Sequence, residues 1–290
     1  MKFFSKFTSK VWTGIILKNG FDLREISKES NLLELPAPND HSISADPSFL
    51  DSENILFESI SNKNGCGQIF HYNLRTKNLY RLGLKVNFHY SFPLTYDFHG
   101  KNYISLESNE GKGIILYRFS YGENNRISEL NKVVIKSNIN FRVIDPVLIK
   151  LKERIYCFGS SYNQPNISYC LGELSMQSDL KGNLISQDIF KVKIPGRLGG
   201  RFIIKGKDII AITQTSTRKY GDGIKIYNLR KGDKLKNTHT ITYKMKNHYG
   251  PHTLNYSPCN NYIAIDMCRE SLHPKDMIVK IKQYLVNKRG

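Results

Sequence analysis

The sequence predicts an all-β fold, a five-bladed β-propeller with a polar central funnel. The first observation is a repeat: five segments each contain a short apolar strand, a turn and a second apolar strand that ends on a polar residue. The second is the spacing, because the equivalent positions Pro47, Pro93, Pro146, Gly200 and His252 lie 46, 53, 54 and 52 residues apart. Repeats of this length are typical of propeller blades, whereas a β-sandwich rarely shows such regular spacing.

The expected elements follow in order along the chain. A first strand near 11–17 closes the ring, and the inner hairpins of the blades lie at 45–60, 90–108, 144–161, 198–216 and 249–267. Further strands at 67–74, 113–119 and 223–229 extend the blades outward. Only 274–288 has the periodicity of a helix. The sequence thus predicts one domain, 1–290, with blades at about 40–85, 86–135, 136–190, 191–235 and 236–275.

The chain is strongly basic, with 43 Lys and Arg residues against 25 Asp and Glu and a formal net charge of +18. Such a charge fits a polyanionic partner, either nucleic acid or an anionic membrane surface. The lysines are scattered, however, and no nucleic-acid recognition motif is present. The chain is equally rich in Asn and Ile, as an AT-rich coding sequence would make it. The charge by itself assigns no function, and we expect no nucleic-acid partner.

Cysteine usage and hydropathy indicate the compartment. The five cysteines include no CxxC pair and no zinc-like spacing, and their odd number disfavours a secreted disulfide framework. The apolar run at 11–17 is too short to span a bilayer. We therefore expect a cytoplasmic protein without a transmembrane segment. No metal-ligand motif is present, although oxygen ligands for calcium exist, and the cofactor is unknown.

Polar side chains collect at one end of the predicted inner hairpins. The start of the first strand and the end of the second lie at the same edge of an antiparallel hairpin, and this edge opens onto the funnel. The starts supply Asp46, His89, Ser91, Asp145, Arg197, Arg201 and His252, and the ends supply Glu58, Glu107, Ser160, Gln214 and Asp266. Because charges are costly to bury unless they are paired, this set implies internal pairs, a ligand, or both. Taken singly, Asp46 and Asp145 also suit Asp-Pro turns.

Short motifs at these positions resemble those of one known family. In chain order they are ADP at 45–47, FES at 57–59, SFP at 91–93, ES at 107–108, LYR at 116–118, DP at 145–146, RLGGRF at 197–202, Gln214, KYG at 219–221 and HTLN at 252–255, after a strand that contains Trp12. Over nearly its whole length the chain is similar to the propeller domain at the N-terminus of plant glucosamine inositolphosphorylceramide transferase. Bacterial counterparts stand alone or beside formyltransferase-like domains in surface-polysaccharide genes.

The resemblance implies a propeller shaped like the arabinanase-like and levansucrase-like glycosidases, whose funnel carboxylates cleave or transfer sugars. By that resemblance Asp46 matches the base or nucleophile, and Asp145 matches the residue that tunes the pKa of the acid. The sequence departs from the pattern at Gln214, which stands where the glycosidases have their general-acid glutamate. An amide cannot donate that proton, so Glu107 or Glu58 is the candidate substitute.

Three functions stay open, and the sequence does not decide whether the chain is an enzyme. The first is a carbohydrate-active or carbohydrate-binding propeller in cell-surface polysaccharide or glycolipid biosynthesis, whose ligand is a sugar, a sugar phosphate or a glycan. The second is an arabinanase-like glycoside hydrolase or transglycosidase, and the third is a non-catalytic scaffold for a biosynthetic enzyme.

The candidate site residues divide by chemistry. The candidate catalytic carboxylates are Asp46, Glu107 and Asp145. The predicted ligand-binding residues are Glu58, Arg197, Arg201, Gln214, Arg218, Tyr220 and His252. Forked guanidinium groups suit a phosphate or a carboxylate on the ligand. Alternatively, Arg197 and Arg201 neutralise the funnel carboxylates.

Overall fold

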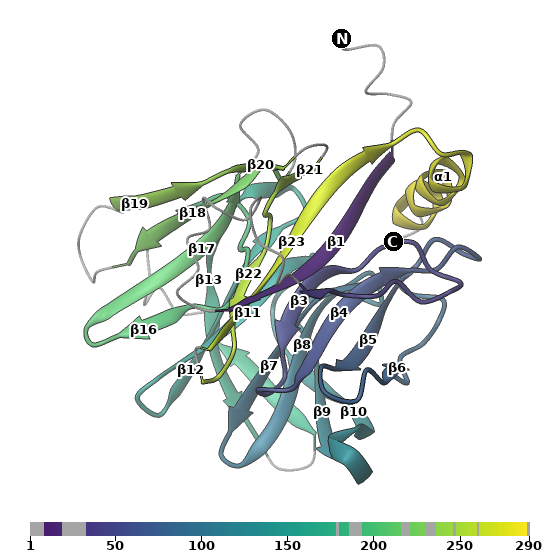
Figure 1. Ribbon diagram of the computed structural model, residues 1–290. Coiled ribbons are helices and arrows are strands. Elements are labelled where there is room, and N and C mark those ends of the chain that lie inside the picture. The colour runs from purple at the N-terminus through teal and green to yellow at the C-terminus, as the bar shows by residue number, and fades with distance from the viewer. Residues whose placement is uncertain are drawn as a thin grey trace.

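In the computed structural model the strands form mainly antiparallel sheets around a common centre (Figure 1). The structure describes residues 9–18, 33–177, 180–185, 193–215, 221–229, 236–245, 248–259 and 261–288. Within these ranges, strands dominate, with a 3-10 turn at Glu123–Asn125 and the helix α1 (Pro274–Lys288). No helix among the described residues is long and apolar enough to cross a membrane. The all-β prediction is confirmed.

Four units follow one another along the chain as antiparallel meanders. The first contains β3 (Ala45–Phe49), β4 (Asn54–Ile60), β5 (Gly67–Asn73) and β6 (Leu79–Arg81). The second contains β7 (Tyr90–Phe98), β8 (Lys101–Ser108), β9 (Ile115–Tyr121) and β10 (Ile127–Lys136). The third contains β11 (Val143–Leu151), β12 (Arg154–Ser161), β13 (Gln164–Met176) and β14 (Lys181–Ile185), with β15 (Ile194–Pro195) beside β13. The fourth contains β16 (Ile203–Lys205), β17 (Asp208–Thr215), β18 (Gly223–Asn228) and β19 (Lys236–Ile241).

The last unit combines strands from both ends of the chain. Its centre is β23 (Tyr262–Ser271), which pairs on one side with β22 (Leu254–Tyr256) and β21 (His248–Gly250), the latter beside β20 (Tyr243–Met245). On the other side β23 pairs with β1 (Ser9–Lys18), and β2 (Leu33–Glu34) follows at the edge. The β1–β23 ladder runs from Ser9 opposite Ser271 to Lys18 opposite Tyr262. The strand expected near 11–17 thus lies against the last strand of the chain.

Two features depart from a simple repeat of separate blades. The strand β10 pairs in parallel with β14, through Val134 opposite Lys181, so the second and third units share one sheet. Residues 236–241 form β19, which pairs with β18 in the fourth sheet. The predicted boundary between 235 and 236 is therefore corrected: the fourth unit continues to Ile241. The repeat spacing alone did not show that 236–241 pairs backward with β18 rather than forward with the fifth unit.

The core lies between neighbouring units. Every residue of β3, β4 and β5 is buried, because both faces of these strands are covered. Leu56 of the first unit clusters with Ile104 and Leu106 of the second. Phe92 of the second unit clusters with Val147 of the third and Ala211 of the fourth. The units therefore hold each other through apolar faces, while their inner strand ends stay available for polar side chains.

A bulge recurs where three of the inner strands begin. Asp46, Phe92 and Asp145 have positive φ angles of 50°, 52° and 46°, and each precedes a proline. The strand register shifts at each of them, between Ala45 and Ser48, between Ser91 and Leu94, and between Ile144 and Val147. A proline disfavours the right-handed helical conformation of the residue before it, and a bulge redirects that residue's side chain. The bulges thereby aim Asp46 and Asp145 at the centre.

Candidate functional site

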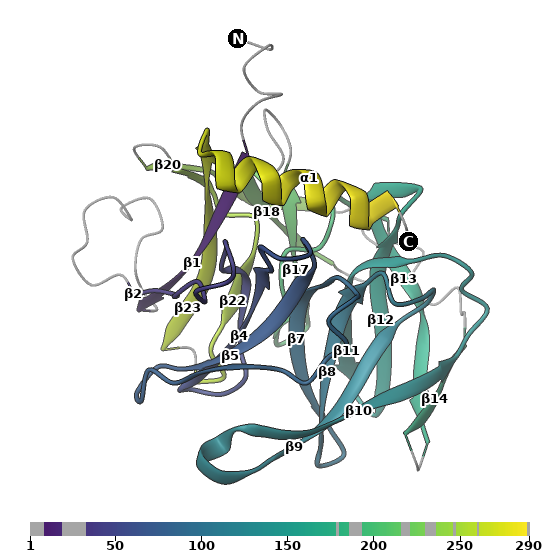
Figure 2. The same cartoon turned by 90° about the vertical axis from the view of Figure 1, so that its right-hand side faces the viewer.

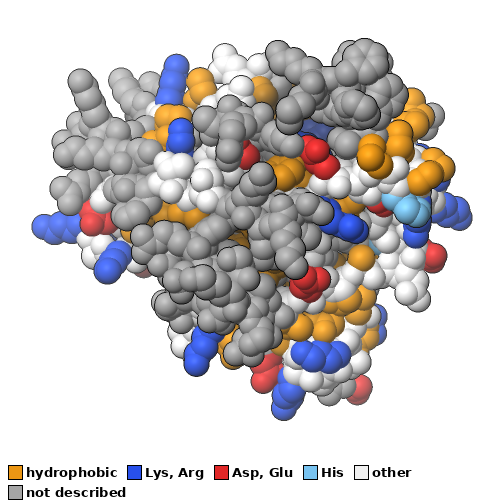
Figure 3. Space-filling model, turned by 45° about the horizontal axis from the view of Figure 1, so that its top comes forward, with side chains coloured by type: hydrophobic (Ala, Val, Ile, Leu, Met, Phe, Trp, Pro, Cys, Tyr) orange, Lys and Arg blue, Asp and Glu red, His pale blue; other side chains and the backbone are white. Residues whose placement is uncertain are grey.

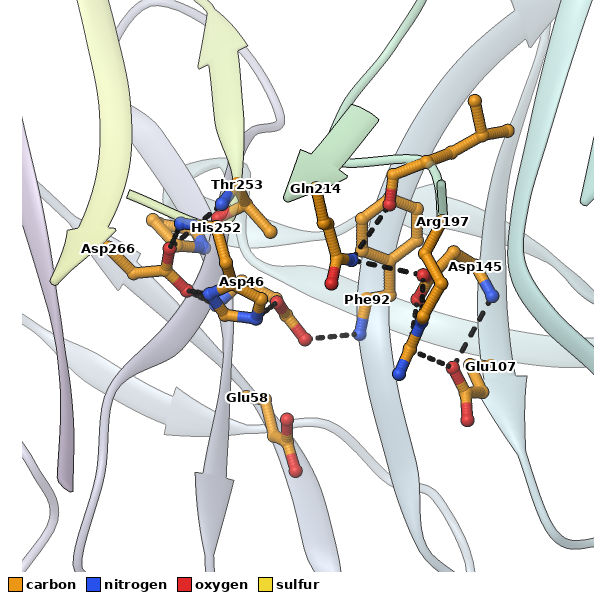
Figure 4. Close-up of polar contacts among 12 residues, drawn as sticks. Asp46, Glu58, Phe92, Glu107, Asp145, Arg197, Gln214, His252, Thr253 and Asp266 are labelled. Carbon is orange, nitrogen blue, oxygen red and sulfur yellow. Dashed lines mark hydrogen bonds and ion pairs between the residues drawn. The ribbon is translucent and has the colours of Figure 1, made fainter. Parts of the chain in front are cut away.

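Side chains from all five described units meet at one end of the inner strands (Figure 4). They form two sets. The histidine set consists of Asp46, His252 and Asp266. The arginine set consists of Glu107, Asp145, Arg142 and Arg197. Glu58 and Gln214 lie beside these sets.

In the histidine set, an imidazole lies between two carboxylates. His252 Nε2 is 3.1 Å from Asp46 Oδ1, and His252 Nδ1 is 2.8 Å from Asp266 Oδ2. The ring of Trp12, from β1, packs on the imidazole with 4.0 Å between ring centroids. Burial alone would lower the pKa of His252, but the charges and hydrogen bonds of Asp266 and Asp46 outweigh it and raise this pKa to about 10. His252 is therefore an imidazolium at neutral pH, and its charge holds the pKa of Asp266 below the ordinary value despite burial.

In the arginine set, one guanidinium group donates hydrogen bonds to two carboxylates. Arg197 donates to Asp145 through Nε (2.7 Å) and Nη2 (2.8 Å), and Nη2 also lies 3.1 Å from Glu107 Oε2. Arg142 Nη2 donates to Glu107 Oε1 at 2.6 Å. Burial raises the pKa of Asp145 to about 7, and Arg197 opposes this shift without cancelling it. Burial alone would raise the pKa of Glu107, but the charges of Arg197 and Arg142 outweigh this effect and lower the pKa.

Glu58 differs from the other carboxyl groups because no described cation pairs closely with it. Burial, followed by the charges of Asp46 and Glu107, raises its pKa well above the ordinary value. Its neighbour His89 accepts a hydrogen bond from the Gly67 amide on Nδ1 (2.8 Å), and burial lowers the pKa of His89 to about 4. A neutral His89 with Nδ1 as an acceptor carries its proton on Nε2, which lies 3.4 Å from Glu58 Oε1. Glu58 is thus a buried carboxyl group whose surroundings favour its protonated form.

Only one of the two polar atoms of the Gln214 side chain has hydrogen-bond partners among the described residues. Its Nε2 donates to Asp145 Oδ2 (3.0 Å) and to the Leu198 carbonyl (2.9 Å). Its Oε1 is buried and has no hydrogen-bond donor among the described residues. In Figure 4 this amide lies between the histidine set and the arginine set. Buried acceptors are nearly always satisfied in native proteins, so this atom marks a place for a donor from a ligand or from water.

The carboxylates also connect neighbouring units through backbone amides. Asp266 Oδ2 accepts the amide of Asp46 (3.0 Å), and Asp46 Oδ2 accepts the amide of Phe92 (3.1 Å). Glu107 Oε2 accepts the amide of Asp145 at 3.3 Å. A carboxylate of one unit thus anchors the bulge of the next unit, from the fifth to the first, the first to the second and the second to the third. These side chains have a structural role in addition to any role with a ligand.

The histidine set also offers candidate metal ligands. One ligand atom from each of Asp46, His252 and Asp266 lies within 4.8 Å of the others. Metal binding needs a neutral imidazole, whereas both nitrogens of His252 face carboxylates and hold the proton strongly. In the described arrangement the imidazolium takes the place of a cation, so the set fits a metal ion poorly.

The structure brings together most of the residues that the sequence singled out. Arg201 lies elsewhere: its Nη2 donates to the Phe49 carbonyl (2.8 Å) and to Thr95 Oγ1, and its guanidinium lies 5.7 Å from the ring centre of Tyr96. It reaches from the fourth unit to the first and second and pairs with no carboxylate among the described residues. The position of Arg201 near a strand start predicted a funnel ligand, because a local sequence pattern does not reveal contacts with residues as distant as Phe49 and Thr95. Arg218 and Tyr220 lie outside the described residues.

Sequence reasoning missed Arg142. A signal was present, because a basic residue precedes the reference position of three successive repeats: His89 before Pro93, Arg142 before Pro146 and Arg197 before Gly200. The structure shows why this position matters, since all three basic side chains contact the carboxylates that end the inner hairpins.

Comparisons with known proteins identify the fold and the family of the chain. A thermostable family-43 glycoside hydrolase is 11% identical with a TM-score of 0.51, over 81% of this chain and 90% of that chain. A family-43 enzyme from Xanthomonas citri is 8% identical with a TM-score of 0.46, over 79% and 86% of the two chains. At such identity the first likeness establishes the propeller fold alone. No curated protein matches the chain. The family model described as glucosamine inositolphosphorylceramide transferase 1, N-terminal, matches residues 59–249, and the chain belongs to this family.

Proposed function

We propose that the chain is a carbohydrate-binding propeller of cell-surface polysaccharide or glycolipid assembly, and that the funnel end holds the hydroxyl groups of an uncharged sugar. The observation that carries this proposal is the buried Oε1 of Gln214, which has no donor among the described residues and lies between the two charged sets. A sugar hydroxyl is a donor and an acceptor at once, so it can satisfy this amide oxygen and a neighbouring charged group together. The family description, which names a glucosamine transferase, supports a sugar ligand.

The charges of the site favour an uncharged sugar over a sugar phosphate. The described groups include the carboxyls of Asp46, Glu107, Asp145 and Asp266 and the cations Arg142, Arg197 and His252. Each of these cations already contacts a carboxylate, so a phosphate would have to compete with an internal ion pair. Sugar hydroxyls need only hydrogen bonds, which carboxylates and guanidinium groups supply while they stay paired.

Binding without cleavage is consistent with the state of Gln214. Its Nε2 is held by Asp145 and by the Leu198 carbonyl, and an amide has no proton to give to a leaving oxygen. One observation favours hydrolysis as a second candidate: burial and the nearby charge of Asp46 raise the pKa of Glu58, which favours its protonated form. A protonated acid near a carboxylate is the pair that glycoside hydrolysis requires.

The test is a thermal-shift screen of the purified chain with neutral oligosaccharides, sugar phosphates and sugar nucleotides, followed by calorimetry on any hit. We expect a neutral glycan to raise the melting temperature, because it binds only the folded chain. The shift should disappear in Gln214→Ala and persist in Gln177→Ala, whose side chain is exposed. A larger shift with sugar phosphates, or equal shifts in the two variants, would contradict the proposal.

Product analysis separates the two candidates. If the site only binds, the bound oligosaccharide is recovered intact. If the chain is a hydrolase, cleavage should occur in the wild type and stop in Glu58→Gln, which keeps the size of the side chain and removes its acid. Cleavage that persists in Glu58→Gln would exclude Glu58 as the proton donor.

A further inference from the structure

The helix α1 presents an apolar side to solvent. Twelve large hydrophobic side chains are exposed in the described part of the chain, and five of them lie between residues 272 and 285. They are Leu272 (63% exposed), Ile278 (53%), Ile281 (60%), Tyr284 (59%) and Leu285 (50%). Residues 278, 281 and 285 are three and four apart, so they share one side of the helix. The other seven are spread over the chain, so this concentration is local.

The opposite side of α1 is fixed to the propeller. Val279 is buried in a cluster with Val11, Trp12, Ala45 and Ile60. The backbone of α1 approaches Gly65 so closely that a Cβ there would lie 2.7 Å from the main chain at residues 282 and 283. Lys282 Nζ donates to the Asn62 carbonyl at 2.7 Å. One side of α1 therefore packs firmly on the propeller, so the apolar residues on its other side are exposed although the helix is in place.

Basic residues accompany the apolar side. Lys275 and Lys280 on the helix are exposed, and so is Lys63 in the turn beneath it. The one acidic residue of α1, Asp276, accepts a hydrogen bond from Ser271 Oγ at 2.5 Å. Figure 3 shows hydrophobic side chains with Lys or Arg beside them at the edge of the molecule where α1 lies in Figure 1. The surface therefore combines large aliphatic side chains, a tyrosine and positive charge.

We propose that α1 is a membrane-docking helix that lies in the interface of an anionic bilayer, with Ile278, Ile281, Tyr284 and Leu285 in the acyl boundary and the lysines at the lipid headgroups. Interfacial helices combine such an apolar side with basic flanks, and each basic residue near an anionic surface adds to the attraction. The formal net charge of +18 for the whole chain acts in the same direction. Charge complementarity favours this occupant over a second copy of the chain, which carries the same positive charge.

Docking through α1 also orients the site. The buried side of the helix shares its cluster with Ala45, next to Asp46, and with Trp12, which packs on His252. Figure 2 shows α1 lying across one end of the strands. A helix seated on the bilayer would therefore hold this end of the inner strands, where the histidine set lies, toward the membrane surface.

The test is flotation of the full chain with phosphatidylcholine vesicles made with and without phosphatidylserine. We expect binding to the vesicles that contain phosphatidylserine and weaker binding at high salt. Replacing Ile278, Ile281 and Leu285 together by Ser should weaken vesicle binding about tenfold or more, because three buried aliphatic groups are lost. The matched control replaces Val134, Ile185 and Ile204 by Ser, which are 66%, 52% and 51% exposed elsewhere on the surface, and should bind like the wild type.

Vesicle binding succeeds or fails independently of what the funnel binds. Melting curves show whether both triple variants keep the fold. Absence of vesicle binding in the wild type, or equal binding by the two triple variants, would overturn the proposal. Wild-type self-association that is lost only in the helix variant, without vesicle binding, would assign the surface to a second copy and overturn it as well.

Discussion

His252 holds a proton that depends on the folded state. Its pKa is about 10 in the folded chain and about 6.5 in the unfolded chain. Between about pH 6.5 and pH 10, the unfolded chain has therefore lost this proton while the folded chain keeps it. The stabilisation is complete below about pH 6.5 and is lost as the pH rises toward 10, at about 1.4 kcal/mol per pH unit. Glu58 acts in the same direction, because its raised pKa makes ionisation unfavourable in the fold.

We therefore expect the free energy of unfolding to decrease with pH. Urea unfolding measured between about pH 7 and 9 should show this slope in the wild type and a smaller slope in His252→Gln, which has no proton to lose. Equal slopes in the two proteins would show that His252 is not the group that keeps its proton.

Arg197 stabilises two carboxylates that are almost fully buried. Its side chain is 23% exposed, whereas those of Asp145 and Glu107 are 2% and 9% exposed. Arg197→Ala would leave Asp145 without its forked partner, and we expect a loss of about 3 kcal/mol in the free energy of unfolding. Arg197→Lys should recover part of this loss, because it keeps the charge without the fork.

The control is Arg154→Ala, which removes an exposed pair with Glu173 at 3.5 Å and should cost less than about 1 kcal/mol. Equal losses for Arg197→Ala and Arg154→Ala in denaturant unfolding would contradict the role of Arg197. Because Arg197 and Asp46 both hold the fold together, variants at these residues change stability and ligand binding at once. Gln214 is the better residue for testing the ligand.

At the scale of elements, the fourth unit carries a different residue type at the equivalent repeat position, for a different structural reason. Three units carry a proline there, Pro47, Pro93 and Pro146, and the fourth carries Gly200. A Cβ at Gly200 would collide with the carbonyl oxygen of Leu254 in the fifth unit. The glycine is therefore needed for the close approach of two backbones rather than for a turn.

Gly200→Ala should destabilise the chain by about 2 kcal/mol, because the collision is with a main-chain atom that cannot move alone. Gly83→Ala is the control: a Cβ there meets nothing within 4 Å, so this variant should be neutral or slightly stabilising. Melting temperatures of the two variants make the comparison. A neutral Gly200→Ala would mean that the fourth and fifth units adjust their spacing freely.

At the scale of the whole molecule, β1 joins the start of the chain to its end. It pairs with β23 over ten residues and buries Ile15 and Leu17 against Ile263, Ile265 and Met267. Deleting residues 1–18 would expose the edge of β23 and the apolar cluster that contains Ile15 and Leu17, and we expect loss of cooperative melting and a tendency to aggregate. Deleting residues 1–8 leaves this ladder intact and should preserve the transition. A cooperative transition at the wild-type temperature without β1 would show that the other units fold as a stable open ring.

The sequence by itself determined the all-β fold, the inner hairpins and the polar positions at their ends. These features are local: apolar alternation, turn residues and a recurring X-Pro step are all contained within a few residues of each other. The resemblance of the short motifs likewise led to the family that the comparison confirmed. The spacing of the repeats located Asp46, Asp145 and Glu107 correctly at one end of the strands.

Only the tertiary structure decided which charges meet and which protons they hold. The Asp46 amide and Asp266 are 220 residues apart in sequence, and Arg197 and Glu107 are 90 apart, so no local pattern pairs them. The cost of desolvation on burial and the nearest charges together set each pKa. This is why the pKa of His252 is raised to about 10, whereas that of His89 is lowered to about 4. The same long-range packing took Arg201 away from the site and turned the apolar side of α1 outward.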